Sequence, residues 1–68
     1  MKHISGKEMC KILERKGWRL LRIRSSHHTY TNSNGGINVT VPVHGNRTLR
    51  TGTQRGIMRD AGLTDADL

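Results

Sequence analysis

The clearest structural signal in the chain is the segment Ile37-Asn38-Val39-Thr40-Val41-Pro42 (INVTVP). Apolar and polar residues alternate strictly from Ile37 to Val41, and Pro42, which lacks a backbone N–H, ends the run. Because successive side chains of a strand point to opposite faces, one face of this segment is aliphatic and the other is polar. The pattern predicts a strand of an antiparallel sheet that has one buried face and one face in water.

A second strand is predicted over Trp18–Arg24. Alternation gives Leu21 and Ile23 the same face, and we expect both side chains to point towards the core. The opposite face then carries Leu20, Arg22 and Arg24.

A third strand is predicted around Thr29–Thr31, directly after the adjacent histidines His27 and His28. Tyr30 is the only large apolar residue there, so we expect its ring in the core. His28 has the same parity and is expected on the buried side near the strand end, whereas His27 faces outward. The run Asn32–Gly36 is rich in Asn and Gly, which adopt positive φ at low cost, and predicts a turn into the next strand.

The N-terminal segment has the signals of a helix. Ser5 and Glu8 have the spacing of a capping box, and Ile4 and Met9 have that of a hydrophobic staple. Gly17 is suited to a left-handed helix end. The expected buried stripe is Met9, Ile12 and Leu13.

The C-terminal segment predicts a second helix, since Thr51 and Gln54 repeat the capping-box spacing and Gly62 can end it. One more helical turn is expected over Thr64–Asp67. The residues expected to face inward are Ile57, Met58 and Ala61, and those expected to face outward are Arg55 and Arg59.

The expected order is therefore α-β-β-β-α, in a single domain over residues 1–68. Two helices can cover one face of a three-stranded antiparallel sheet and leave the other face open. This α+β layout is that of a double-stranded-RNA-binding domain.

The composition limits what such a domain can hold. The chain has 68 residues, 32% of them hydrophobic, with no Phe and one Trp. A domain of this length buries roughly 60% of its unfolded surface, so its core is thin and leaves no room for a deep cofactor pocket. Without an apolar run of signal-peptide or membrane-spanning length, we expect a cytoplasmic protein with no membrane association.

The charge points to a polyanionic partner. The net charge is +7, from twelve Lys and Arg against five Asp and Glu, and the pI is near 10.9. Domains this basic most often bind nucleic acid. An acidic protein partner is compatible with the same charge.

The polar face of the predicted sheet is the candidate functional surface. Cations bind phosphate, hydroxyl groups can bind the 2′-OH of RNA, and a histidine can move a proton near neutral pH. Since the 2′-OH can attack its own adjacent phosphate, cleavage of RNA does not strictly require a metal. By alternation this face carries Arg22, Arg24, His27, Thr29, Thr31, Asn38 and Thr40.

The residues alone leave the role of each histidine open. An exposed histidine such as His27 is most often an ordinary polar residue. His28 has a structural explanation as a partly buried, hydrogen-bonded side chain. His44 fits either a substrate contact or a bond to its own loop. A zinc site formed by these three and Cys10 is disfavoured, because no two of them have a familiar ligand spacing, and Cys10 reads as a small buried apolar residue.

Several short motifs occur in the order and spacing of a known family. Ser5–Glu8 (SGKE) opens the first helix and Lys16–Trp18 (KGW) ends it. Ser26–Tyr30 (SHHTY) begins the strand predicted around Thr29–Thr31. Val41–His44 (VPVH) closes the last strand in the chain, and Gly52–Leu63 covers the final helix. Over nearly the whole chain, the sequence resembles the HicA toxins, the small ribonucleases of bacterial type II toxin–antitoxin systems.

The resemblance implies a fold like that of double-stranded-RNA-binding domains, cleavage of mRNA without a metal or other cofactor, arrest of translation, and neutralisation by the antitoxin HicB. The family's catalytic histidine follows a Gly-Ser pair, and the matching position is His27. Ser25 replaces that glycine. The serine side chain would hinder a positive φ or a close approach of RNA to the backbone. Gln54 replaces a residue that is often leucine but keeps the capping-box spacing.

We therefore predict an endoribonuclease in which His27 is the general base or acid. The expected RNA contacts are Lys16, Arg22, Arg24, Ser26, Thr29 and His44. The alternatives are a non-catalytic RNA-binding module of the same fold, and a basic subunit that binds only a protein. A pure binding module would be served equally well by Lys or Asn at position 27.

Overall fold

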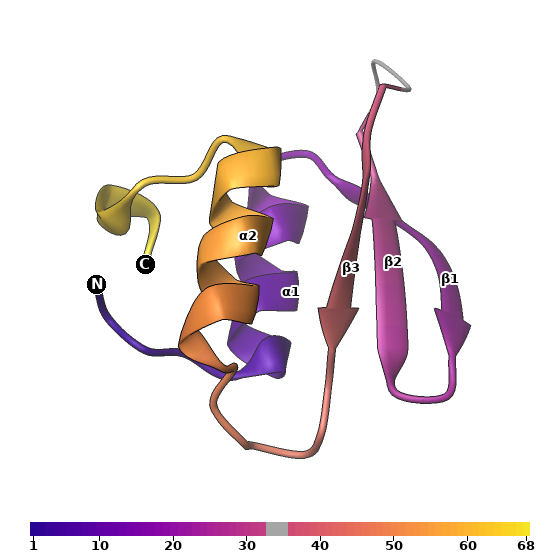
Figure 1. The fold of residues 1–68 in the computed structure, drawn as a ribbon. Coiled ribbons are helices and arrows are strands. Elements are labelled where there is room, and N and C mark those ends of the chain that lie inside the picture. Colours follow the sequence, from indigo (N-terminus) through magenta and orange to yellow (C-terminus); the bar gives the residue numbers. More distant parts are fainter. Residues whose placement is uncertain (33–35) are drawn as a thin grey trace.

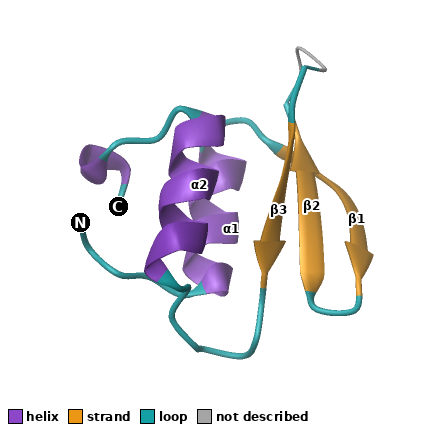
Figure 2. Cartoon of the chain, in the orientation of Figure 1, coloured by secondary structure: helices purple, strands orange, loops and turns teal. Residues whose placement is uncertain are grey.

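The computed structural model describes residues 1–32 and 36–68 and confirms the predicted α-β-β-β-α order. The strands form one antiparallel sheet in the order β1-β2-β3, and both helices lie on the same face of it (Figures 1 and 2). Residues 33–35 of the predicted turn Asn32–Gly36 lie outside the described residues. The elements are α1 (Gly6–Arg15), β1 (Arg19–Arg24), β2 (His27–Thr31), β3 (Asn38–Pro42), α2 (Thr51–Ala61) and a 3₁₀ turn, η1 (Asp65–Asp67).

Helix α1 begins and ends as its sequence predicts. The Ser5 hydroxyl accepts a hydrogen bond from the Glu8 amide at 3.1 Å, and the Glu8 carboxylate accepts one from the Ser5 amide at 3.1 Å. These bonds satisfy amides that have no partner within the helix, and they hold the pKa of Glu8 below its usual value. At the other end Gly17 has φ +93°, and the Trp18 amide donates to the Leu13 carbonyl at 3.0 Å, which is a Schellman ending.

The core lies between the helices and the sheet. Strand β3 alternates as predicted from Asn38 onward, with Val39 and Val41 buried and Asn38 and Thr40 exposed. Ile37, which was expected on the buried face, precedes the strand and is 50% exposed. The ring of Tyr30 in the central strand is also buried. The remaining buried apolar residues are Ile4, Met9, Cys10, Ile12, Leu13, Trp18, Leu49, Ile57, Met58 and Leu63.

Strand β1 corrects the prediction. Leu21 and Ile23 are 49% and 55% exposed, so their expected burial is wrong. The register shifts between Leu20 and Arg22, which makes Leu21 the extra residue of a β-bulge and brings Leu20 opposite Tyr30. Leu20 therefore lies on the helix-facing side rather than on the open side. It is 45% exposed all the same, because the helices lie over β2 and β3 and leave β1 uncovered (Figure 1).

The predicted capping box of α2 is also wrong. Arg50 is the N-cap and makes no side-chain capping bond. The fully buried Gln54 side chain instead accepts a hydrogen bond from the Ile4 amide at 3.2 Å and donates one to the Lys2 carbonyl at 2.7 Å. Gln54 thus ties the N-terminal segment to α2. The predicted helix end at Gly62, with φ +69°, is confirmed.

A close backbone approach fixes where α1 starts. Gly6 is buried, and a side chain there would meet the carbonyl oxygen of Pro42. The first turn of α1 therefore lies directly against the end of β3.

Within the part of the chain that the structure describes, none of the helices combines the length and hydrophobicity that crossing a membrane requires.

Candidate functional site

The β1–β2 hairpin positions His27. Ser25 and Ser26 form its two-residue turn, and Ser25 has φ +55° whereas Ser26 does not have positive φ. This combination is typical of turns that favour glycine at their first position. A glycine at position 25 would adopt this φ without the strain that a side chain brings. His27 follows the turn directly as the first residue of β2 and is exposed.

Three rows of side chains cross the open face of the sheet, and the third, formed by Arg19, Thr31 and Asn38, lies farthest from the hairpin turn. In the first row His27 lies between Arg24 and Pro42, and in the second Thr29 lies between Arg22 and Thr40. Directly opposed residues on one face of an antiparallel pair have their Cβ atoms roughly 5 Å apart. The structure therefore brings Arg24 beside His27 and places Arg22 one row away.

Thr29 lies on this face but is only 5% exposed. Its hydroxyl and that of Thr40 share a hydrogen bond of 3.1 Å. The expected hydroxyl contact with RNA at Thr29 is thus largely covered by its neighbours, and Thr40 offers the more exposed hydroxyl of the pair.

The segment after β3 joins the same end of the molecule. The Val43 amide donates to the Ser26 carbonyl at 2.8 Å, which draws this segment to the hairpin turn. The exposed His44 follows immediately. Ser26 is partly buried, and its backbone carbonyl is committed to this bond.

A hollow of about 400 Å³ opens beside β3, and Pro42 and His44 form part of its wall. Its remaining polar lining comes from Arg47, Thr48, Arg50 and Thr53. The sequence analysis considered His44 in this loop as a substrate contact but gave no role to the loop's arginines. The available signal was the His-x-x-Arg-x-x-Arg spacing between a strand-ending proline and a helix start, which gathers positive charge at one helix N-terminus.

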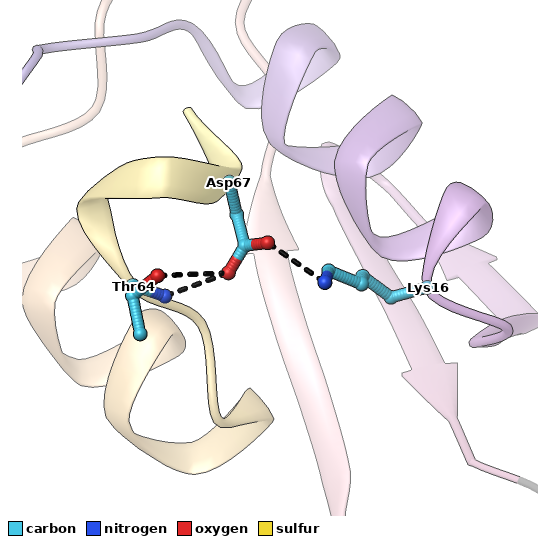
Figure 3. A network of polar contacts seen from close by, with 3 residues as sticks. All are labelled: Lys16, Thr64 and Asp67. Carbon is cyan, nitrogen blue, oxygen red and sulfur yellow. Dashed lines mark hydrogen bonds and ion pairs between the residues drawn. The ribbon is translucent and has the colours of Figure 1, made fainter.

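Lys16 lies apart from His27 and from the hollow beside β3. Its ammonium group lies 2.7 Å from a carboxylate oxygen of Asp67, whose other oxygen accepts a 2.7 Å hydrogen bond from the Thr64 amide (Figure 3). The Lys16 ammonium holds the pKa of Asp67 below its usual value. Because α1 begins at Gly6, against the Pro42 carbonyl, and extends over 10 residues, roughly 15 Å separate Lys16 from the end of β3 that pairs with His27.

Three further side chains that could take part in chemistry lie away from the open face: Cys10, Tyr30 and His28. Burial raises the pKa of the Cys10 thiol, which favours the unreactive protonated form. The Tyr30 hydroxyl donates to the Glu14 carboxylate at 2.7 Å. His28 is partly buried on the helix-facing side. Across residues 1–32 and 36–68, no three His, Cys, Asp or Glu side chains are grouped closely enough to hold a metal ion.

The fold and the open face define a small basic α-β-β-β-α domain whose uncovered side presents arginines, hydroxyl groups and a histidine. A family model described as the HicA toxin of bacterial toxin–antitoxin systems matches residues 6–63. The chain belongs to the HicA toxin family. The comparison with curated proteins gives no match.

Proposed function

We propose that this toxin is an endoribonuclease that cleaves mRNA without a metal, arrests translation, and is neutralised by a HicB-type antitoxin. The observation that supports this most strongly is the position of His27. The side chain is exposed, adjoins Arg24, and lies on the face that no helix covers.

The reaction needs two proton transfers. The 2′-oxygen of one nucleotide attacks the adjacent phosphorus, and the bond from phosphorus to the 5′-oxygen of the next nucleotide breaks. The 2′-OH proton passes to a general base, and the leaving 5′-oxygen receives a proton from a general acid. His27 performs one of these transfers. The upstream fragment then ends in a 2′,3′-cyclic phosphate, and the downstream fragment begins with a 5′-hydroxyl.

Positive charge assists the same step. The guanidinium of Arg24 stabilises negative charge that builds on the phosphate oxygens, and Arg22 binds the neighbouring backbone. His44, with Arg47 and Arg50 around the hollow, holds the RNA strand beyond the scissile phosphate. Lys16 lies at the far end of α1 and has no part in this arrangement.

The test is cleavage of end-labelled RNA in excess EDTA by the wild type, His27→Ala and His28→Ala. We expect His27→Ala to lower the rate by about 10²- to 10⁴-fold, which is the usual contribution of a general acid or base. His28→Ala is the matched control, because it removes the adjacent imidazole from the other face of the same strand.

Undiminished cleavage by His27→Ala would refute the catalytic assignment. If the wild type binds RNA tightly at low salt but leaves it intact, the non-catalytic RNA-binding module becomes the correct function. Circular dichroism of each variant establishes that a lost activity is not a lost fold.

A further inference from the structure

Strand β1 carries three large aliphatic side chains that the fold leaves about half exposed: Leu20, Leu21 and Ile23, together called the β1 ledge. No residue of β1 is buried. Leu20 and Ile23 lie on the helix-facing side, in register with Tyr30 and His28. An apolar strand in this position is a candidate interaction surface.

The backbone of β1 is available to a partner as well. β1 pairs only with β2, so its outer N–H and C=O groups have no neighbouring strand within the described residues. Figure 1 shows β1 as the strand farthest from both helices. An exposed apolar edge of this kind is where a segment of another chain can add a strand.

The charges of β1 indicate what kind of segment fits. The charged residues of the strand are all arginines, and its pairing places them on the open face, opposite Leu20 and Ile23. A segment along this edge therefore meets guanidinium groups on one face and aliphatic groups on the other. Alternating acidic and aliphatic residues match both faces. The arginines are Arg19, Arg22 and Arg24.

This pattern distinguishes a protein partner from other occupants. A second copy of β1 would add a strand that has no carboxylates and would bring arginine towards arginine, which is unfavourable across a sheet. RNA phosphates would match the arginines but leave the aliphatic side chains in water.

We propose that the β1 ledge is the docking surface for an acidic partner protein, which adds an extended segment of alternating acidic and aliphatic residues to the outer edge of β1. The partner is the cognate antitoxin, and this identification rests on the proposed function. Because Arg24 lies beside His27, the added segment occupies cations that RNA also needs. Docking at the edge and inhibition of cleavage are therefore coupled.

The first measurement is the affinity of the cognate antitoxin for the wild type, Ile23→Ser and Ile37→Ser by titration calorimetry. Ile37 is the matched control, since it is 50% exposed but precedes the opposite edge strand, β3. We expect Ile23→Ser to weaken binding by at least about tenfold and Ile37→Ser to change it less than about twofold. Equal affinities of the two variants would overturn the proposal.

The second measurement is backbone hydrogen exchange in the toxin–antitoxin complex. We expect slower exchange over Arg19–Arg24 and over an acidic-aliphatic segment of the antitoxin. Unchanged exchange in β1, or protection of β1 by RNA but not by the antitoxin, would contradict the docking surface. A free toxin dimer that Ile23→Ser converts to a monomer would assign the ledge to a second copy instead.

Neither measurement depends on RNA cleavage. A chain without nuclease activity would leave the test of the ledge intact. A toxin that cleaves RNA through His27 but whose antitoxin ignores β1 would overturn the ledge alone.

Discussion

The two edge strands of the sheet flank the same central strand, and their side chains have very different surroundings. One row crosses all three strands on the helix-facing side: Leu20 in β1 is 45% exposed, Tyr30 in β2 is 1% exposed, and Val39 in β3 is 3% exposed. The backbone places all three residues on the same face. The difference arises because β1 is the edge strand farthest from the helices, and none of its residues is buried (Figure 1). Alternation thus predicts which way a side chain points, but not whether another layer covers it.

The largest effect is expected where α1 meets β3. Gly6→Ala would place a methyl group against the Pro42 carbonyl, so that α1 must move away from the strand. We expect a loss of about 3 kcal/mol in the free energy of unfolding, measured with urea. Gly52→Ala is the control, since beyond its chain neighbours and the backbone of its own helix no atom lies within 4 Å of the added carbon, and it should change stability by less than about 1 kcal/mol. Equal stability of the two variants would refute this contact.

The comparison of the edges is tested most simply by truncating one aliphatic side chain on each. Val41→Ala removes fully buried methyl groups and should cost about 2 kcal/mol, whereas Ile23→Ala should cost less than about 1 kcal/mol. Urea unfolding of both variants gives the two values. Similar losses would mean that β1 is covered in solution.

The hairpin between β1 and β2 should gain stability from glycine. Ser25 has φ +55°, where a side chain is strained, so Ser25→Gly should stabilise the fold by about 1 kcal/mol. Ser26→Gly should instead be destabilising, because Ser26 has no positive φ to relieve. Thermal unfolding distinguishes the two, and a less stable Ser25→Gly variant would argue against this turn geometry.

The smallest effect is expected at Tyr30, the buried residue between Leu20 and Val39 in the helix-facing row. Tyr30→Phe removes the hydrogen bond to Glu14 and should cost about 0.5 kcal/mol at neutral pH. Burial, and then the bond to Glu14, raise the pKa of Tyr30. The folded state therefore keeps the neutral phenol while the unfolded chain ionises above about pH 10, and stability falls as the pH rises through that range.

The difference in unfolding free energy between wild type and Tyr30→Phe should accordingly shrink above about pH 10. The wild type has one tyrosine, so its phenolate absorbance reports on this side chain alone. Phenolate that forms at its ordinary pH in the folded protein would contradict the burial of Tyr30.

Much of the fold follows from local signals. The capping box at Ser5, the left-handed glycines at 17 and 62, and the alternation of β3 each depend on a few neighbouring residues, and all are confirmed. The outward direction of His27 also follows from parity with Tyr30.

The errors depend on contacts between distant segments. The bulge at Leu21 moves Leu20 to the helix-facing side while Arg22, Ile23 and Arg24 keep their predicted sides, and no residue of that strand signals it. Gln54 has the spacing of a cap, but its partners are the backbone of Lys2 and Ile4, about fifty positions away. The ion pair of Lys16 with Asp67 likewise joins distant segments, and the RNA contact expected at Lys16 stays a prediction. Such features require knowledge of how the layers pack.

The central claim is that His27 moves a proton to or from RNA during attack by the 2′-OH, and the chemistry of the product ends tests it most directly. RNA cleaved by the wild type in EDTA should yield fragments that end in a 2′,3′-cyclic phosphate and begin with a 5′-hydroxyl, as identified by mass spectrometry. His27→Ala should produce few of these fragments. Fragments with 3′-hydroxyl and 5′-phosphate ends would instead show that water attacks the phosphate, and would contradict the mechanism.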